Sequence, residues 1–335
     1  MPVRDLLLTG SIDGALSPFF VIWAVWIGMV GAVIGSFINV VALRLPAGIS
    51  FVTPRSRCPH CQHPIAWFDN IPLLSFALLR SRCRHCHGAI SWQYPAVEAL
   101  AAAIALGLWL TRGPSVALLC DAAACGLLLT LAVIDARTYL LPEVLTIPLI
   151  AVALAGRALV PWLDLDASWA EIWRALVDGA AGAALSFLLF AVVRWLGTRL
   201  ARRSGRIGPD EEAMGIGDLV LITGIGAMVG LAGSLGTIML GSVQGALIGG
   251  LLLLVRGRHD AANGPDPGAT PVLETPVVGD TAEADDGDDN NGDDWLPPPL
   301  SIPFGPFLAL AAVEWIFVGE WLTQKFFGLL GRLVG

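Results

Sequence analysis

The feature that most constrains this chain is a series of apolar runs, each near the about 20 residues that an α-helix needs to cross a bilayer. Charged residues make up only 14% of the chain, against about 25% in soluble globular proteins, and mean hydropathy is +0.70. We place eight runs at 17–43, 94–111, 115–135, 140–160, 175–197, 217–231, 234–255 and 303–323. The sequence therefore predicts an all-α polytopic membrane protein with eight transmembrane helices and excludes a soluble protein.

Glycines recur at four-residue spacing within these runs, as at Gly226/Gly230 and Gly241/Gly245. Small residues at this spacing let helices approach closely in lipid, so we expect a compact bundle. The run 217–231 is short, and we expect its helix to be broken or tilted.

The arginines predict the orientation in the membrane. Segment 44–93 contains six arginines and one acidic residue, and segment 198–214 contains four arginines. Both segments are predicted to face the cytoplasm, because short cytoplasmic loops carry an excess of basic residues. This places a small cytoplasmic domain between the first and second helices and both termini on the outer side.

The net charge of −8 arises from a single segment. Residues 259–294 contain 11 acidic residues and no lysine or arginine. The segment is also rich in proline, glycine and aspartate, so we expect a disordered, solvated tether, with partner binding as the alternative. The predicted organisation is 1–43, the N-terminus and first transmembrane helix; 44–93, the cytoplasmic domain; 94–258, the transmembrane core; 259–299, the acidic insertion; and 300–335, the last transmembrane helix and C-terminus.

Acidic residues lie within or at the edge of the predicted helices at Asp121, Asp135, Asp218 and Glu314. Each needs a physical reason, because a charge in hydrocarbon costs at least ~2.5 kcal/mol. Asp135 ends the third run and Asp218 opens the sixth, and both ends are predicted to be cytoplasmic. These two carboxylates are therefore expected at one depth, whereas Asp121 and Glu314 have no matching acid at their own depth.

The surroundings of this pair predict chemistry. Pro142 follows Asp135, and Gly215 and Gly217 precede Asp218, which favours irregular backbone of the kind that lines a wet cavity. Two neighbouring carboxylates cannot both ionise easily, so the pair would hold one proton. The ionised member would then take a proton from water while its partner protonates a carbonyl oxygen, as in aspartic proteases.

Three alternatives stay open for these acids. Each aspartate could cap a helix end at the membrane surface. A proton-coupled transporter also uses intramembrane acids, and it would distribute them across the membrane thickness. A membrane scaffold that recruits partners through the acidic insertion would leave the matched pair unexplained.

The cysteines of segment 44–93 predict a metal site. Cys58-x-x-Cys61 and Cys83-x-x-Cys86 form two knuckles of the kind that surround zinc with four thiolates. A closed four-cysteine site has no free position for water, so its expected role is structural. Two redox-active dithiols are the alternative, and the remaining two cysteines are interpreted as ordinary buried residues.

Five segments together resemble the bacterial prepilin peptidases, the bifunctional type IV leader peptidase/N-methyltransferases of the GxGD membrane aspartyl class. They are GSFINVVALRLP (35–46), the cysteine-containing segment 56–98, IDARTYLLPEVLTIP (134–148), EAMGIGDLVL (212–221) and IPFGPFLALAA (302–312). The resemblance implies that Asp135 and Asp218 are the catalytic aspartates.

The resemblance also implies the substrates and a second activity. Family members cleave type IV prepilins and type II secretion pseudopilins on the cytoplasmic side of the bacterial inner membrane, after the glycine that ends a basic leader. Many then methylate the new N-terminus with S-adenosylmethionine, and Gly35 and Asn39 match a motif associated with that activity. The implied partners are pilin-type substrates and membrane lipid, without nucleic acid. No glycine-rich S-adenosylmethionine signature is found in the sequence.

The chain departs from the family pattern at three positions. Val220 replaces a lysine usual after the second aspartate, Glu143 stands where aspartate is frequent, and Gln93 stands where arginine is common. Both carboxylates are retained, so peptidase chemistry is expected to survive these changes.

Overall fold

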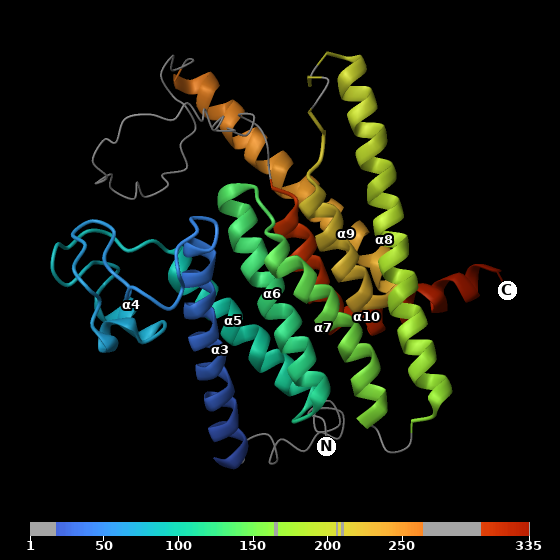
Figure 1. The fold of residues 1–335 in the computed structure, drawn as a ribbon, viewed down its shortest axis with the longest axis horizontal. Coiled ribbons are helices and arrows are strands. Elements are labelled where there is room, and N and C mark those ends of the chain that lie inside the picture. The colour runs from blue at the N-terminus through green and yellow to red at the C-terminus, as the bar shows by residue number, and fades with distance from the viewer. Residues whose placement is uncertain (1–17, 164–166, 206, 209–210, 264–302, 335) are drawn as a thin grey trace.

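The computed structural model describes residues 18–163, 167–205, 207–208, 211–263 and 303–334. Within these ranges the regular elements are all helical, and the long helices form an elongated bundle (Figure 1). Six helices are long and apolar enough to cross a membrane. They are α3 (Pro18–Arg44), α5 (Gln93–Arg112), α6 (Val116–Thr138), α7 (Glu143–Leu163), α8 (Trp169–Arg203) and α9 (Ile216–Asn263).

A further helix, α10 (Gly305–Val334), contains a shorter apolar segment, and two short helices, η1 (Trp67–Asn70) and α4 (Leu74–Leu78), lie between α3 and α5. The all-α polytopic prediction is therefore confirmed. The acidic insertion lies largely outside the described residues.

Helix α9 is divided in two at Gly230, which has φ 76° and ψ −173°. Its second part runs antiparallel to α10, because Gly236 faces Trp315 while Gly241, further along α9, faces the earlier residue Leu308. Leu308 also shares a core cluster with residues of the first part of α9, such as Ile222. The predicted runs 217–231 and 234–255 thus correspond to the two parts of α9, which is one of the six candidate membrane-spanning helices among the described residues.

A charged cluster that the sequence analysis missed holds the break in α9. Arg157 of α7 forms an ion pair of 2.6 Å with Asp178 of α8 and donates two hydrogen bonds to the Met228 carbonyl. Asp178 in turn accepts a hydrogen bond of 3.1 Å from the Leu231 amide. A Cβ atom at Gly230 would overlap the Asp178 carboxylate, so the turn requires glycine.

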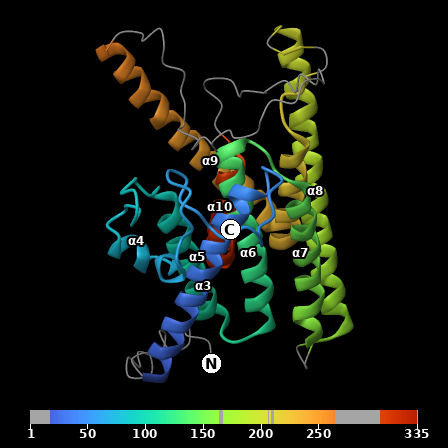
Figure 2. The same ribbon diagram turned by 60° about the vertical axis from the view of Figure 1, so that its left-hand side comes forward.

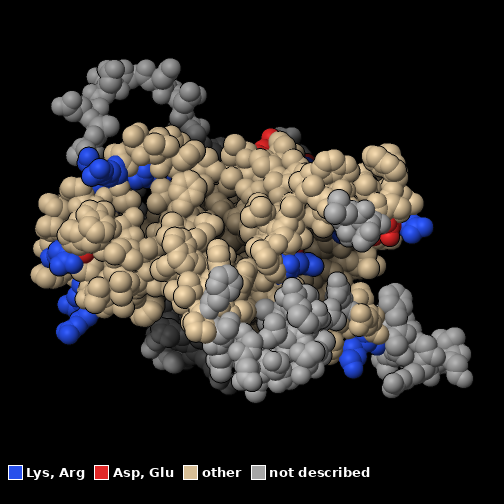
Figure 3. All heavy atoms as spheres, turned by 90° about the horizontal axis from the view of Figure 1, so that it is seen from below, with Lys and Arg blue, Asp and Glu red and all other residues tan. Residues whose placement is uncertain are grey.

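One end of the bundle gathers the chain segments that matter for function. Helices α3 and α6 end there and α5, α7, α9 and α10 begin there; we call it the Asp135 end, and it is the upper end in Figure 1. Seen from the opposite side, most of the visible face carries neither basic nor acidic side chains (Figure 3). Many exposed side chains of the helices are large and apolar, for example Val33 and Phe37 of α3, as expected for contact with lipid.

Candidate active site and metal centre

Asp135 lies in the last turn of α6 and is buried, with 4% of its surface exposed. Its Oδ2 accepts a hydrogen bond of 3.0 Å from the backbone amide of Gly305, the first residue of α10. A Cβ atom on Gly305 would lie 2.5 Å from the same oxygen, so glycine lets the start of α10 approach the carboxylate. The free amides and the dipole at a helix N-terminus favour a negative charge. This contact therefore favours the ionised form of Asp135.

Asp218 lies in the first turn of α9 and is half-buried. The preceding Gly217 packs against Leu141, which belongs to the connection between α6 and α7: a Cβ on Gly217 would lie 2.8 Å from the Leu141 Cβ. This close approach brings the start of α9 to the end of α6, and the carboxylates of Asp135 and Asp218 lie within electrostatic range of each other. The structure thus places the two acids at one end of the bundle.

An arginine of α8 fixes the segment that leads into Asp218. Arg194 donates a hydrogen bond of 3.1 Å from Nε to the Met214 carbonyl and forms an ion pair with Glu212. Further along α8, Arg202 donates to the Glu211 carbonyl at 2.9 Å. These contacts hold the segment 211–215 against α8 and so determine where α9 begins.

The two other acids of the sequence analysis have local partners. Asp121 pairs with Arg112 at 2.9 Å, and Glu314 accepts a hydrogen bond of 2.5 Å from Gln244. Each carboxylate is therefore accounted for by a neighbour in its own region of the bundle. These pairings weaken the transporter alternative, which drew its support from Asp121 and Glu314.

Gly35 and Asn39, the residues matched by resemblance to a motif associated with methyltransferase activity, lie at the contact of α3 with α5. A Cβ on Gly35 would lie 2.6 Å from the Glu98 Cα, and Asn39 is buried and donates to the carbonyls of Gly35 and Tyr94. The network continues, because Gln93 donates to the Asn39 Oδ1 at 3.4 Å and accepts from Arg137 at 2.7 Å. Asn39 is thereby linked to the last turn of α6, two residues beyond Asp135.

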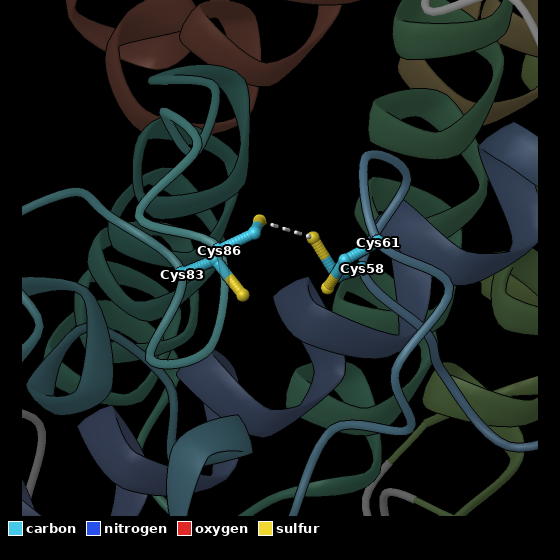
Figure 4. A group of neighbouring side chains, drawn as sticks. All are labelled: Cys58, Cys61, Cys83 and Cys86. Atoms are coloured by element: carbon cyan, nitrogen blue, oxygen red, sulfur yellow. Dashed lines mark hydrogen bonds between the residues drawn. The ribbon is translucent and has the colours of Figure 1, made fainter.

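The four predicted metal-binding cysteines converge from two loops (Figure 4). Their sulfur atoms all lie within 4.8 Å of one another, and the Cys58 and Cys86 sulfurs are 3.8 Å apart. In a tetrahedral site with zinc–sulfur bonds of about 2.3 Å, the sulfurs are about 3.8 Å apart. The donor set and its spacing therefore fit zinc.

The two knuckles are structural repeats. The Cys58 amide bonds to the His63 carbonyl, and the Cys83 amide bonds to the Gly88 carbonyl in the same way. Residues Gln62 and His87, each four positions after the first cysteine of its knuckle, both have positive φ. The sequence carries this repeat as RCPHCQHPI (57–65) and RCRHCHGAI (82–90), a signal that the sequence analysis did not use.

Burial and hydrogen bonding act oppositely on two of the thiols. Burial raises the pKa of the Cys58 thiol to about 11. Backbone amides of Cys86 and His85 lower the pKa of the Cys83 thiol to about 6. A cation among the four sulfurs would favour the thiolate of the buried Cys58, because metal binding requires deprotonated ligands.

The fold and these sites define a class: a polytopic membrane protein with two neighbouring aspartates at one end of its bundle, beside a four-cysteine domain. Residues 29–111 match the bacterial peptidase A24 N-terminal domain, and residues 122–250 match the type IV leader peptidase family. The chain belongs to the type IV leader peptidase family, as the resemblance predicted, and is a peptidase of that family.

Curated relatives are similar in sequence to this chain along most of its length. A prepilin leader peptidase/N-methyltransferase of Myxococcus xanthus is 35% identical over 94% of this chain and 95% of its own length. Proteins of the same description from Klebsiella pneumoniae, 37% identical over 66% of this chain and 91% of the relative, and from Aeromonas hydrophila, 32% identical over 87% and 89%, are also similar. The comparison with solved structures gave no match.

Proposed function

We propose that Asp135 and Asp218 are the catalytic pair of an endopeptidase that removes the leader of type IV prepilins and type II secretion pseudopilins after glycine. The observation that carries the proposal is the placement of both acids at the Asp135 end, with the Gly305 amide on only one of them. The hydrogen bond from the Gly305 amide to one carboxylate distinguishes the two acids, and a water-activating pair needs that distinction.

The asymmetry assigns a role to each acid. In the proposed roles Asp135, whose ionised form is favoured by the hydrogen bond from the Gly305 amide, takes a proton from water as the water oxygen adds to the scissile carbonyl carbon, and Asp218 protonates the carbonyl oxygen. The resulting diol collapses when the carbon–nitrogen bond breaks. The leaving amine takes the proton held by Asp135, and Asp218 recovers a proton from a diol hydroxyl. Both residues return to their starting states.

Cleavage of a prepilin by membranes containing the full-length protein tests this proposal. Asp135→Asn and Asp218→Asn should each abolish loss of the leader, because neither amide can exchange the required proton. Asp121→Asn is the matched control, an acid near the other end of α6 that pairs with Arg112, and it should retain cleavage. Leader removal by either Asn variant at the wild-type rate would refute the assignment.

The proposed orientation places the Asp135 end on the cytoplasmic side of the bacterial inner membrane. It is supported by the arginines near the C-terminal ends of α3 and α8, such as Arg44, Arg199 and Arg203, since basic residues gather on that side. This side is also where a basic leader would meet the two acids.

The second proposed activity is methylation of the new N-terminus with S-adenosylmethionine, supported by the similarity to relatives described as prepilin leader peptidase/N-methyltransferases. Gly35 and Asn39 are proposed to contribute to it. Mass spectrometry of the product N-terminus tests both ideas: the wild type with S-adenosylmethionine should add one methyl group, and Asn39→Ala should lower methylation more than cleavage. An unmethylated wild-type product would reject the activity, and unchanged methylation in Asn39→Ala would reject the residue assignment.

We further propose that the four cysteines hold one structural zinc ion. The purified protein should contain about one zinc per chain. Replacement of Cys58 and Cys61 by serine should remove it, whereas Cys120→Ser, which changes a cysteine of α6 outside the cluster, should leave the content unchanged. Stoichiometric zinc in the double variant would contradict the site.

A further inference from the structure

The four-cysteine domain exposes more large apolar side chains than a domain surrounded by water would. The exposed ones are Ile49, Phe51, Val52, Trp67, Phe68, Ile71, Leu74, Leu78 and Trp92. Trp67 is 80% exposed, Val52 76% and Leu78 72%. Contiguous exposed apolar surface marks contact with a protein or a membrane. We call these nine residues the apolar loops: Ile49, Phe51 and Val52 form the first apolar loop, and the six from Trp67 to Trp92 form the second.

The first apolar loop folds back along the lipid-facing side of α3. The rings of Phe51 and Phe37 meet edge to face, with centroids 6.2 Å apart. Phe37 precedes the end of α3 at Arg44 by seven residues, or about 10 Å of helix. The apolar stretch Phe20–Arg44 has 25 residues, about 37 Å of helix against a hydrocarbon core of about 30 Å. Phe51 therefore lies at a depth where α3 still faces lipid.

The second apolar loop is held against the start of α5. The Leu73 amide donates a hydrogen bond of 2.8 Å to the carboxylate of Glu98, which is buried in the second turn of α5. Leu73 has φ 61°, an uncommon conformation for a leucine, so this position is fixed by its surroundings. Phe76 packs on Trp92 at 4.8 Å between ring centroids. These contacts keep α4, with exposed Leu74 and Leu78, beside the membrane-spanning helix.

Both views of the ribbon agree with these contacts. The domain that contains α4 lies beside the upper part of α3 and α5 in Figure 1 and again in Figure 2, not as a cap beyond the helix ends. Its apolar loops thus continue the lipid-facing surface of the two helices. Exposed arginines of the same domain, such as Arg55 and Arg80, have side chains long enough to reach lipid phosphates.

We propose that the four-cysteine domain is a membrane-surface domain, whose apolar loops insert into the boundary between lipid headgroups and acyl chains. Aromatic residues such as Trp67 and Trp92 suit that boundary, because an amphipathic ring is favoured there. Apolar side chains that enter the interface by about 5–10 Å remove their surface from water without a protein partner. This insertion fixes the depth of the domain in the membrane relative to the Asp135 end. This inference does not depend on the proposed peptidase roles.

Photo-crosslinking in lipid nanodiscs tests the inference on the full-length protein. The photoreactive residue p-benzoylphenylalanine is placed at Leu78 and, in a second variant, at Trp67. Val33, 57% exposed on α3, is the lipid-facing control, and Gln62, exposed and polar in the first knuckle, is the control within the same domain. Retained zinc shows that each variant keeps the domain folded.

The inference predicts phospholipid adducts at Leu78 and Trp67 with yields comparable to Val33 and well above Gln62. Absence of lipid adducts at both positions, in variants that retain zinc, would overturn it. Crosslinks from these positions to an added prepilin or to a second copy of the chain, without lipid adducts, would assign the surface to a protein partner and also overturn it.

Discussion

Replacing Gly305 by alanine isolates the contact that distinguishes the two catalytic aspartates in the proposed mechanism. The added Cβ would lie 2.5 Å from Asp135 Oδ2 and 3.1 Å from its Cγ, where ordinary contact begins near 3.4 Å. The carboxylate or the start of α10 must therefore move by about 0.9 Å, and displacements of about 1 Å at reacting groups cost about 10²-fold in rate. The hydrogen bond from the Gly305 amide is lost or lengthened in either case.

The energy of that hydrogen bond gives a similar magnitude. A hydrogen bond to a charged group contributes about 1.5–3 kcal/mol, which corresponds to about 10- to 10²-fold in rate. We expect kcat for leader cleavage to fall by about 10- to 10²-fold while KM stays near its wild-type value, because the contact acts on the reacting group and not on bound substrate.

The assay is the initial rate of leader removal from a purified prepilin over a range of substrate concentrations. Gly245→Ala is the matched control: this glycine faces Phe304 and Phe307 near the same helix start, and its added Cβ would meet them at an ordinary 3.5 Å. It should cleave at the wild-type rate. If Gly305→Ala retains the wild-type kcat, the start of α10 does not control Asp135, and the assigned roles are wrong.

Three further predictions follow from other parts of the molecule. Gly230→Ala should lower the free energy of unfolding in detergent by about 1–3 kcal/mol, because the backbone angles at this position are essentially restricted to glycine. Gly126→Ala is the control, because a Cβ atom there would meet nothing within 4 Å. Equal melting temperatures of the two variants would show that alanine is not strained at position 230. Gln93→Arg should lower the cleavage rate, because it places a second cation beside Arg137 in place of the hydrogen-bond acceptor. Gln93→Glu keeps an acceptor and should not lower the rate. Equal cleavage rates in the two variants would show that the contact between residue 93 and Arg137 does not affect cleavage. Zinc should dissociate as pH falls and the four cysteines become protonated, and full zinc retention in acid, measured after gel filtration, would argue against thiolate ligation.

Local sequence patterns sufficed to predict the membrane-spanning helices and the metal site. The length of an apolar run alone predicts a membrane-spanning helix. In hydrocarbon the backbone N–H and C=O groups must be hydrogen-bonded within the segment, whatever that segment packs against. The spacing of Cys58 and Cys61, repeated at Cys83 and Cys86, likewise predicts a tetrahedral site because each knuckle is set by a few neighbouring residues. The matched depth of Asp135 and Asp218 followed from counting helix ends.

The partners of these elements were decided only by the tertiary structure. Gly305 and Asp135 are 170 residues apart, and nothing in either segment indicates that one amide meets one carboxylate oxygen. Arg157 and Asp178 lie inside two predicted apolar runs, and the sequence indicates neither their pairing nor the turn that they hold. Local propensity and hydrophobicity act along the chain, whereas contacts between distant side chains depend on how the helices pack, and that is why the sequence located the acids while the fold determined which of them α10 contacts.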